Sequence, residues 1–151
     1  KKLSEEERAN VALAFLPLIL EGHHKKTGGR CSADTFIDTQ PDIINIPGYL
    51  DSLNVKDRPQ PFVLELYRDC KLQPSAVFLV IEKQALPMSS LLEAVDQCYK
   101  CHFVLDCKYQ DQCRSVWYFF QTCVFGQGPK TGKESAALRA LRAYMSFRMV
   151  P

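Results

Sequence analysis

Phe62-Val63-Leu64-Glu65-Leu66-Tyr67 decides the fold of this chain, together with Val77-Phe78-Leu79-Val80-Ile81-Glu82. Both stretches are short and rich in β-branched and aromatic residues, which is typical of β-strands. Segment 68–75 between them contains turn-forming residues, so we expect an antiparallel hairpin with one face shared by Phe62, Leu64 and Leu66. Both stretches are almost continuously apolar, which indicates a hairpin covered on both faces. Two strands alone are marginally stable, so a third strand or packed helices must complete the layer.

The part of the chain before the hairpin has helical patterns. Ser4 and Glu7 form a capping box, in which each side chain bonds the other residue's backbone N–H, and apolar residues then recur at three- and four-residue spacing. We expect a helix over Leu3–Leu20, with a kink or an early end at Pro17. Two shorter helical segments are expected after it: a turn that carries Phe36 and Ile37 and ends before Pro41, and the later part of 45–53.

The part of the chain after Pro87 also has helical patterns. Ser90 can cap one helix, with Glu93 at its third position, and Asp111 opens a second helix. Apolar residues follow both starts at helical spacing. They are Leu91, Val95, Cys98, His102 and Leu105 in the first helix, and Cys113, Val116, Trp117, Phe120, Cys123 and Val124 in the second.

Together these patterns predict an α+β fold, with helices flanking a central apolar β-hairpin and a helical C-terminal half. We expect 1–125 to form a single α+β domain, 126–133 to be a glycine-rich linker, and 134–151 to be an appended amphipathic helix. A helix of about four turns is marginal alone in water, so it must dock an apolar face. We favour docking on a second chain over docking on its own domain.

Composition and charge exclude several classes of protein. A net charge of +2 is too small to imply a nucleic-acid or acidic-surface partner by bulk electrostatics, so any basic patch would have to be local. The longest apolar runs are too short to cross a bilayer, so we expect no membrane partner. The first residues are charged, unlike those of a secretory signal peptide. The chain has seven cysteines, and an odd number cannot all pair in disulfides within one chain. We therefore expect an intracellular protein, nuclear or cytoplasmic, with mostly reduced thiols.

Cys98-Tyr99-Lys100-Cys101-His102 is the one string that matches a chemical motif, the attachment sequence of a c-type haem. It lies within a helical pattern, where cysteine commonly packs as a small core residue. We expect no cofactor and no metal. Zinc is kept as an alternative for Cys98, Cys101, Cys107 and Cys113, although their spacings are shorter than those that usually join the two halves of a structural zinc site. A disulfide between two of the predicted loop cysteines also stays open, among Cys31, Cys70 and Cys107.

No arrangement of residues in the sequence identifies a reaction. His102 lies on an apolar face, where a histidine is more often a satisfied core residue than a general base. Segment 127–134 resembles a phosphate-binding loop but lacks the first glycine and the final Ser or Thr that this motif requires. Asp38 and Gln40 precede Pro41 and are expected to hold a turn. We therefore expect no enzyme and no catalytic residue.

Four strings in the chain resemble a known domain: Phe36-Ile37-Asp38-Thr39-Gln40-Pro41, Ala85-Leu86-Pro87, Leu91-Leu92-Glu93-Ala94-Val95-Asp96 and Cys113-Arg114-Ser115-Val116-Trp117. The chain is similar to the recurrent C-terminal domain of multicopy vertebrate proteins labelled sterile-alpha-motif-domain-containing protein 3-like, some of them linked to mobile elements. The likeness runs roughly from Phe15 to Phe125 and implies shared packing and turns, but no catalytic residue and no function. The positions of Cys101 and Cys107 are not typically cysteine in that domain, which weakens the metal and haem interpretations.

The expected role is a non-catalytic protein-interaction or self-association module of a larger intracellular protein. An abundant core, no cluster of polar residues and a surplus of aromatic residues favour it. We expect a protein interface, including a homodimer through the C-terminal helix, to use Leu138, Leu141, Tyr144, Met145, Tyr118 and Phe119. The first alternative is a nucleic-acid-binding module of a mobile-element-derived protein, and the second is a small zinc-binding domain. Anion contacts in the first alternative would use Lys25, Lys26, Arg30, Arg139 and Arg142.

Overall fold

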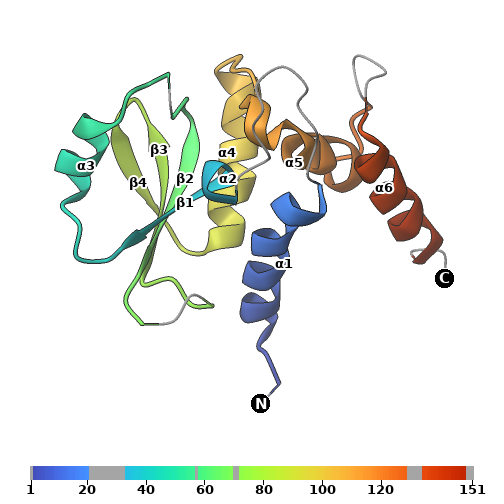
Figure 1. Ribbon diagram of the computed structural model, residues 1–151, viewed down its shortest axis with the longest axis horizontal. Coiled ribbons are helices and arrows are strands. Elements are labelled where there is room, and N and C mark those ends of the chain that lie inside the picture. Colours follow the sequence, from blue (N-terminus) through green and yellow to red (C-terminus); the bar gives the residue numbers. More distant parts are fainter. Residues whose placement is uncertain (1, 21–32, 57, 70–71, 129–133, 149–151) are drawn as a thin grey trace.

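The computed structural model describes residues 2–20, 33–56, 58–69, 72–128 and 134–148 (Figure 1). Within them a four-stranded mixed sheet has the order β1-β2-β3-β4 and packs with helices, so the α+β class is confirmed. The strands are β1 (Ile37–Pro41), β2 (Phe62–Tyr67), β3 (Ala76–Ile81) and β4 (Gln84–Met88). The helices are α1 (Glu5–Ile19), α2 (Ala33–Phe36), α3 (Ile46–Ser52), α4 (Leu91–Val104), α5 (Arg114–Phe119) and α6 (Ala136–Arg148), with a 3₁₀ turn η1 (Asp111–Cys113) before α5 and a π-helical turn η2 (Phe120–Val124) after it.

The centre of the sheet is the predicted hairpin. Strands β2 and β3 pair antiparallel, with Phe62 opposite Val80 and Leu66 opposite Ala76. All residues of β2 from Phe62 to Leu66 are buried, as its continuous apolar pattern predicts. Two further strands complete the layer, β1 beside β2 and β4 beside β3.

Strand β1 corrects one expectation. Ile37 does not continue the short helix α2, which ends at Phe36, but begins a strand that pairs in parallel with β2. The next three residues, 38–40, are polar, so no apolar alternation marks this strand in the sequence. Pairing with the buried β2 stabilises it, beginning with Ile37 opposite Val63. The segment before Pro41 that was expected to hold a turn is therefore an edge of the sheet.

Strand β4 is absent from the sequence-based expectations. Glu82 and Lys83 form the turn that leads into it from β3, with φ angles of 48° and 61°. Two-residue hairpin turns of this kind have positive φ at both positions and are usually marked by Asn-Gly or Asp-Gly, so the Glu-Lys pair hides the turn. Pro87 lies within β4 opposite Phe78, where a proline is tolerated because β4 is an edge strand.

The hairpin lies between helices on either side (Figure 1), and its alternate residues belong to two separate apolar clusters. On one face, Phe62, Leu64 and Leu66 form the shared face that the sequence predicts and pack with Leu50 of α3. On the other face, Val63 joins a larger core built mainly by α1, α4 and α5. Full burial of one such side chain is worth about 1.5–3 kcal/mol, so both layers stabilise the sheet.

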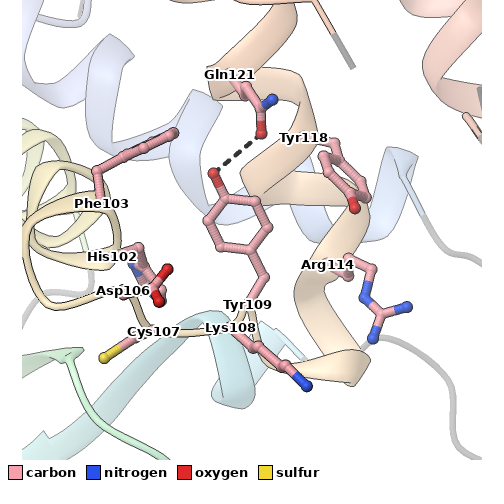
Figure 2. A pocket seen from close by; sticks show the side chains of 9 residues that line it. All are labelled: His102, Phe103, Asp106, Cys107, Lys108, Tyr109, Arg114, Tyr118 and Gln121. Carbon is pink, nitrogen blue, oxygen red and sulfur yellow. Dashed lines mark hydrogen bonds between the residues drawn. The ribbon is translucent and has the colours of Figure 1, made fainter. Parts of the chain in front are cut away.

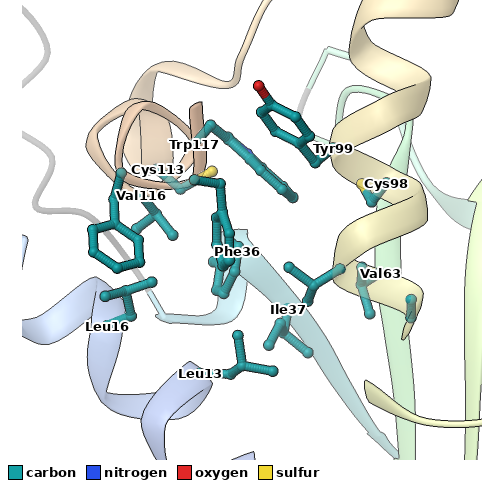
Figure 3. Close-up of a cluster of buried hydrophobic side chains, with 14 of the residues drawn as sticks. Leu13, Leu16, Phe36, Ile37, Val63, Cys98, Tyr99, Cys113, Val116 and Trp117 are labelled. Carbon is teal, nitrogen blue, oxygen red and sulfur yellow. The ribbon is translucent and has the colours of Figure 1, made fainter. Parts of the chain in front are cut away.

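Trp117 lies at the centre of the larger core (Figure 3). It is 1% exposed, and its ring meets the ring of Phe36 edge-on, with 5.1 Å between the centroids. Leu13 and Leu16 extend from α1 into the same cluster, and Cys98 enters it from α4. Helices from both ends of the chain are therefore held together by one apolar cluster.

The helix starts follow the predicted capping residues. The Ser4 hydroxyl accepts the Glu7 backbone N–H at 3.1 Å, and the Glu7 carboxylate accepts the Ser4 backbone N–H at 2.7 Å. The Ser90 hydroxyl accepts the Glu93 backbone N–H at 3.1 Å and begins α4. Pro17 lies inside α1, which continues through it to Ile19 and has Leu20 as its C-cap, so the early end expected at the proline does not occur.

The helix expected from Asp111 is divided into η1, α5 and η2. A π turn contains more residues per turn than an α-helix and rotates the side chains that follow. Val124 is consequently 54% exposed, although its spacing predicts burial. Leu105 is likewise 48% exposed, because α4 ends one residue before it.

Candidate functional site

The candidate zinc cysteines are not arranged as a metal site. Cys98 and Cys113 are fully buried, while Cys101 and Cys107 are partly buried. Among the described residues, no group of three or more His, Cys, Asp or Glu side chains could hold a metal ion. Burial raises the pKa of the Cys98 thiol well above its usual value, so this thiol is protonated in the structure as described. Cys107 is a free thiol, and the other cysteines considered for a disulfide lie outside the described residues: Cys31 and Cys70.

His102 is a core residue. Its Nδ1 lies 2.8 Å from the carbonyl oxygen of Cys98, so Nδ1 carries a proton and donates it. The ring packs between Tyr109 and Trp117, with centroid distances of 5.2 Å and 4.9 Å. His102 is 4% exposed, and this burial lowers its pKa. The ring is therefore neutral at physiological pH and engaged with the backbone, which suits a structural role.

A cavity of about 530 Å³ lies between the C-terminal end of α4 and α5 (Figure 2). The Tyr109 hydroxyl lies within it and donates a hydrogen bond to Oε1 of Gln121 at 3.1 Å. The aromatic residues of the lining are Phe103, Tyr109 and Tyr118. Its charged residues are the acidic Asp106 and the positively charged Lys108 and Arg114. This composition can hold an organic group by apolar contact and a few polar bonds.

The described residues that line this cavity contain no activated nucleophile. The Cys107 sulfur lies 3.6 Å from the carbonyl oxygen of Leu105, and Figure 2 shows it directed away from Tyr109. Burial raises the pKa of Tyr109, so its phenol stays neutral. Arg114 is engaged in an ion pair with Asp111.

A buried ionic network surrounds Asp38, which is 2% exposed. Its carboxylate accepts hydrogen bonds from the Tyr49 hydroxyl at 2.5 Å and the Gln40 amide at 2.9 Å. Arg58 approaches the same carboxylate at 3.5 Å and donates to the carbonyl oxygen of Asp34 at 2.6 Å. Burial first, and then the hydrogen bond and charge of Asp38, raise the pKa of Tyr49 to about 12. The network ties β1 to α3 and to the segment before β2, so these side chains hold a strand and not the expected turn.

Glu65 is a second buried carboxylate, on the opposite face of the sheet from Asp38. Its Oε1 accepts hydrogen bonds from the Thr39 hydroxyl at 2.8 Å and the Tyr67 hydroxyl at 2.7 Å. Sequence reasoning missed Glu65 because it appears there as one polar residue in an apolar strand. Both carboxylates are satisfied by neighbouring donors, which is the usual state of buried structural groups.

The inner stripe of α6, defined as Leu138, Leu141 and Met145, is docked on the chain's own core. Leu138 is 0% exposed, and the other two are partly buried against the same cluster. This corrects the expectation that this stripe docks on a second chain. The physical reason is proximity in the sequence, because α6 packs beside α5, and closing a short connection costs little chain entropy.

The other predicted interface residues lie in different environments. Phe119 is 9% exposed and packs against Phe120 in the core, with 5.6 Å between the ring centroids. Tyr118 lines the cavity and meets Tyr109 edge-on at 5.5 Å. Tyr144, in contrast, is 58% exposed on α6. It is the most accessible of the six predicted interface residues.

Helix α6 carries a second apolar stripe, which sequence reasoning missed. Phe147 is nine positions after Leu138, and at about 100° per residue the two side chains lie on opposite sides of the helix. Phe147 is 85% exposed. We name this set the outer stripe; all its members are exposed, and they are Ala136, Ala140, Ala143, Tyr144 and Phe147. In the sequence this stripe is visible only as alanines at three- and four-residue spacing. Because alanine is also common in helices for its high helix propensity, these alanines do not indicate a binding surface.

The predicted anion contacts differ in their environments. Arg142 is paired with Glu134 through two hydrogen bonds of 2.7 Å and 2.5 Å. Arg139 is exposed on the same helix. The other three lie outside the described residues: Lys25, Lys26 and Arg30.

An apolar groove lies between α4 and η2, with a volume of about 590 Å³. We name it the α4–η2 groove. Its buried residues include Val95 and Phe120, which are 0% and 7% exposed. Exposed apolar residues and two acids complete the lining: Leu92, Val124, Phe125, Glu93 and Asp96. Sequence reasoning missed the groove because its two walls are far apart in the chain.

None of the helices in the described part of the chain is both long enough and apolar enough to span a membrane. No family model, curated protein or solved structure matches the chain. What the chain does must therefore be inferred from its own surfaces.

Proposed function

We propose that this chain is a non-catalytic protein-interaction module of a larger intracellular protein, and that it binds through the outer stripe of α6. The observation that carries the proposal is that α6 is apolar on two opposite sides. A surface helix of a single domain needs only one apolar side, and the inner stripe already provides it. Tyr144 and Phe147 are then left for a partner, whose contact would remove their apolar surface from water.

The buried polar residues support a non-catalytic role. Asp38 and Glu65 accept hydrogen bonds from neighbouring side chains, and His102 donates to the backbone. A general acid or base must reach a substrate and exchange a proton with it. These three groups instead stabilise the sheet and the packing of α4.

The two alternative functions have less support. For nucleic-acid binding, Arg142 is neutralised by Glu134, and most of the predicted basic contacts lie outside the described residues. For zinc binding, the four cysteines do not form a metal-holding group in the part of the chain that the structure describes. Fluorescence anisotropy with DNA and RNA at two salt concentrations tests the first alternative, because phosphate contacts weaken steeply as salt rises.

Size-exclusion chromatography with light scattering tests the proposal, together with pull-down against separately purified candidate partners. The wild-type chain is expected to self-associate or to retain a partner, and Phe147→Asp to lose that association while keeping the wild-type circular dichroism spectrum. Ile43→Asp is the matched control, because Ile43 is 88% exposed and belongs to the connection between β1 and α3, outside α6. A monomer that retains no partner contradicts the proposal, and so does binding that Phe147→Asp leaves unchanged.

A further inference from the structure

The outer stripe of α6 is flanked by positive charge. Arg139 and Arg148 are exposed beside it, and the helix itself contains no acidic residue. Two such helices placed side by side would bring like charges together, which opposes their association. A complementary surface must therefore be apolar where it meets Tyr144 and Phe147 and acidic at its edges.

The α4–η2 groove has this composition. Leu92 and Val124 are 53% and 54% exposed, so they offer apolar surface that the chain itself does not cover. Glu93 supplies an acidic group in the same groove, whereas the Asp96 carboxylate is already paired with the Lys100 ammonium on α4. Hydrogen bonds from Ser89 lower the pKa of Glu93, so its carboxylate is charged at neutral pH.

The groove is not filled by the α6 of its own chain. None of the described residues of α6 lines it. The inner stripe, beginning with Leu138, holds α6 against its own core, and the outer stripe faces the opposite way. An α6 helix that enters the groove must therefore come from another molecule.

We infer that the outer stripe of α6 in one copy docks in the α4–η2 groove of a second copy, and that the second copy returns the same contact. This inference rests on the proposed interaction function and names its partner. Two equal contacts related by a two-fold axis give a closed dimer. In each contact Tyr144 and Phe147 cover the exposed apolar residues of the groove, while an arginine that flanks the stripe faces Glu93.

Analytical ultracentrifugation of the full chain over a range of concentrations tests this dimer. Phe147→Asp changes the helix and Leu92→Asp changes the groove, and each substitution damages both symmetry-related contacts. Loss of one hot spot corresponds to about 30-fold, so we expect each substitution, which damages two contacts, to raise the dimer dissociation constant by about 1,000-fold. Ile43→Asp, at an equally open apolar site, is expected to leave the constant within about threefold. Circular dichroism confirms that each variant is folded.

Mixing the two damaged variants identifies the contact. Phe147→Asp keeps an intact groove and Leu92→Asp keeps an intact helix face, so their mixture retains one of the two contacts. Native mass spectrometry, with one variant isotopically labelled, is expected to detect heterodimers under conditions where each variant alone is monomeric. Raising the salt concentration is expected to weaken the wild-type dimer, because its charged groups are partly exposed.

Three results would overturn the inference. If Phe147→Asp abolishes the dimer but Leu92→Asp does not, α6 docks at a surface other than the α4–η2 groove. A monomeric wild-type chain that loses a separate purified partner on Phe147→Asp would refute the second-copy partner and leave the proposed function standing. A wild-type dimer that both variants leave intact would refute the docking inference and the proposed function together.

Discussion

The substitution Tyr49→Phe tests whether the buried network around Asp38 stabilises the fold. It removes only a hydroxyl, which donates to the Asp38 carboxylate at 2.5 Å and accepts from the Gln40 amide at 3.1 Å. The carboxylate is 2% exposed, so water cannot readily replace the lost donor. A hydrogen bond to a charged group contributes about 1.5–3 kcal/mol, and we expect the free energy of unfolding at pH 7 to fall by this amount.

The same substitution has a pH dependence of defined sign. The pKa of Tyr49 is raised to about 12 in the folded chain, against about 10 for an unfolded tyrosine. The neutral phenol therefore stabilises the fold fully below pH 10, and this contribution is lost as pH rises from 10 to 12. The difference in stability between wild type and Tyr49→Phe should narrow over that interval, while changes at other groups cancel between the two proteins.

Urea unfolding under reducing conditions measures both effects, at pH 7, 9 and 11.5. Tyr144→Phe is the control, because Tyr144 is 58% exposed, and it is expected to change the stability by less than about 0.5 kcal/mol. A cost below about 0.5 kcal/mol for Tyr49→Phe at pH 7 would show that the network contributes no net stability. A difference that stays constant from pH 9 to 11.5 would show that the Tyr49 proton is not held by the fold.

Three other substitutions or modifications test the packing and the turns. Lys83→Gly should raise the free energy of unfolding by about 0.5–1 kcal/mol in urea, because Lys83 has a φ of 61° that glycine adopts without strain; a loss of stability would refute this turn geometry. Leu138→Ala should lower the free energy of unfolding by about 2–5 kcal/mol at every protein concentration, because Leu138 is 0% exposed. A decrease below about 1 kcal/mol would mean that α6 is not part of this core. Thiol alkylation followed by peptide mass mapping should label Cys123 in the folded chain, but Cys98 and Cys113 only after unfolding; native labelling of Cys98 would contradict its burial.

The central hairpin and the capped helices could be predicted because their signals are local. Strand β2 is a continuous apolar run, and its burial on both faces follows from that composition. Ser4 and Ser90 mark helix starts through bonds to residues three positions later, which a sequence displays directly. Asn45 caps α3 in the same way, and the helical part of that ambiguous segment was correctly placed after it.

The rest depends on contacts between distant segments. Strands β1 and β4 are polar or contain proline, and their pairing with β2 and β3 determines their conformation. Asp38 has a partner in Tyr49 of α3 and another in Arg58, and no motif joins these positions. The α4–η2 groove brings Leu92 beside Val124 only after the helices pack. Such sites arise from tertiary structure, which periodicity within one segment does not encode.

Each edge strand of the sheet contains a proline. Pro41 ends β1, and Pro87 lies within β4. Proline has no backbone N–H to donate to an added strand, so neither edge presents the full row of donors that another chain's strand would need. Copies of this chain are thereby hindered from extending one another's sheets, which is the route from an open edge to a fibril. Association through helices does not extend the sheet. If it follows a two-fold axis, as in the proposed contact, it gives a closed dimer and not a growing fibre.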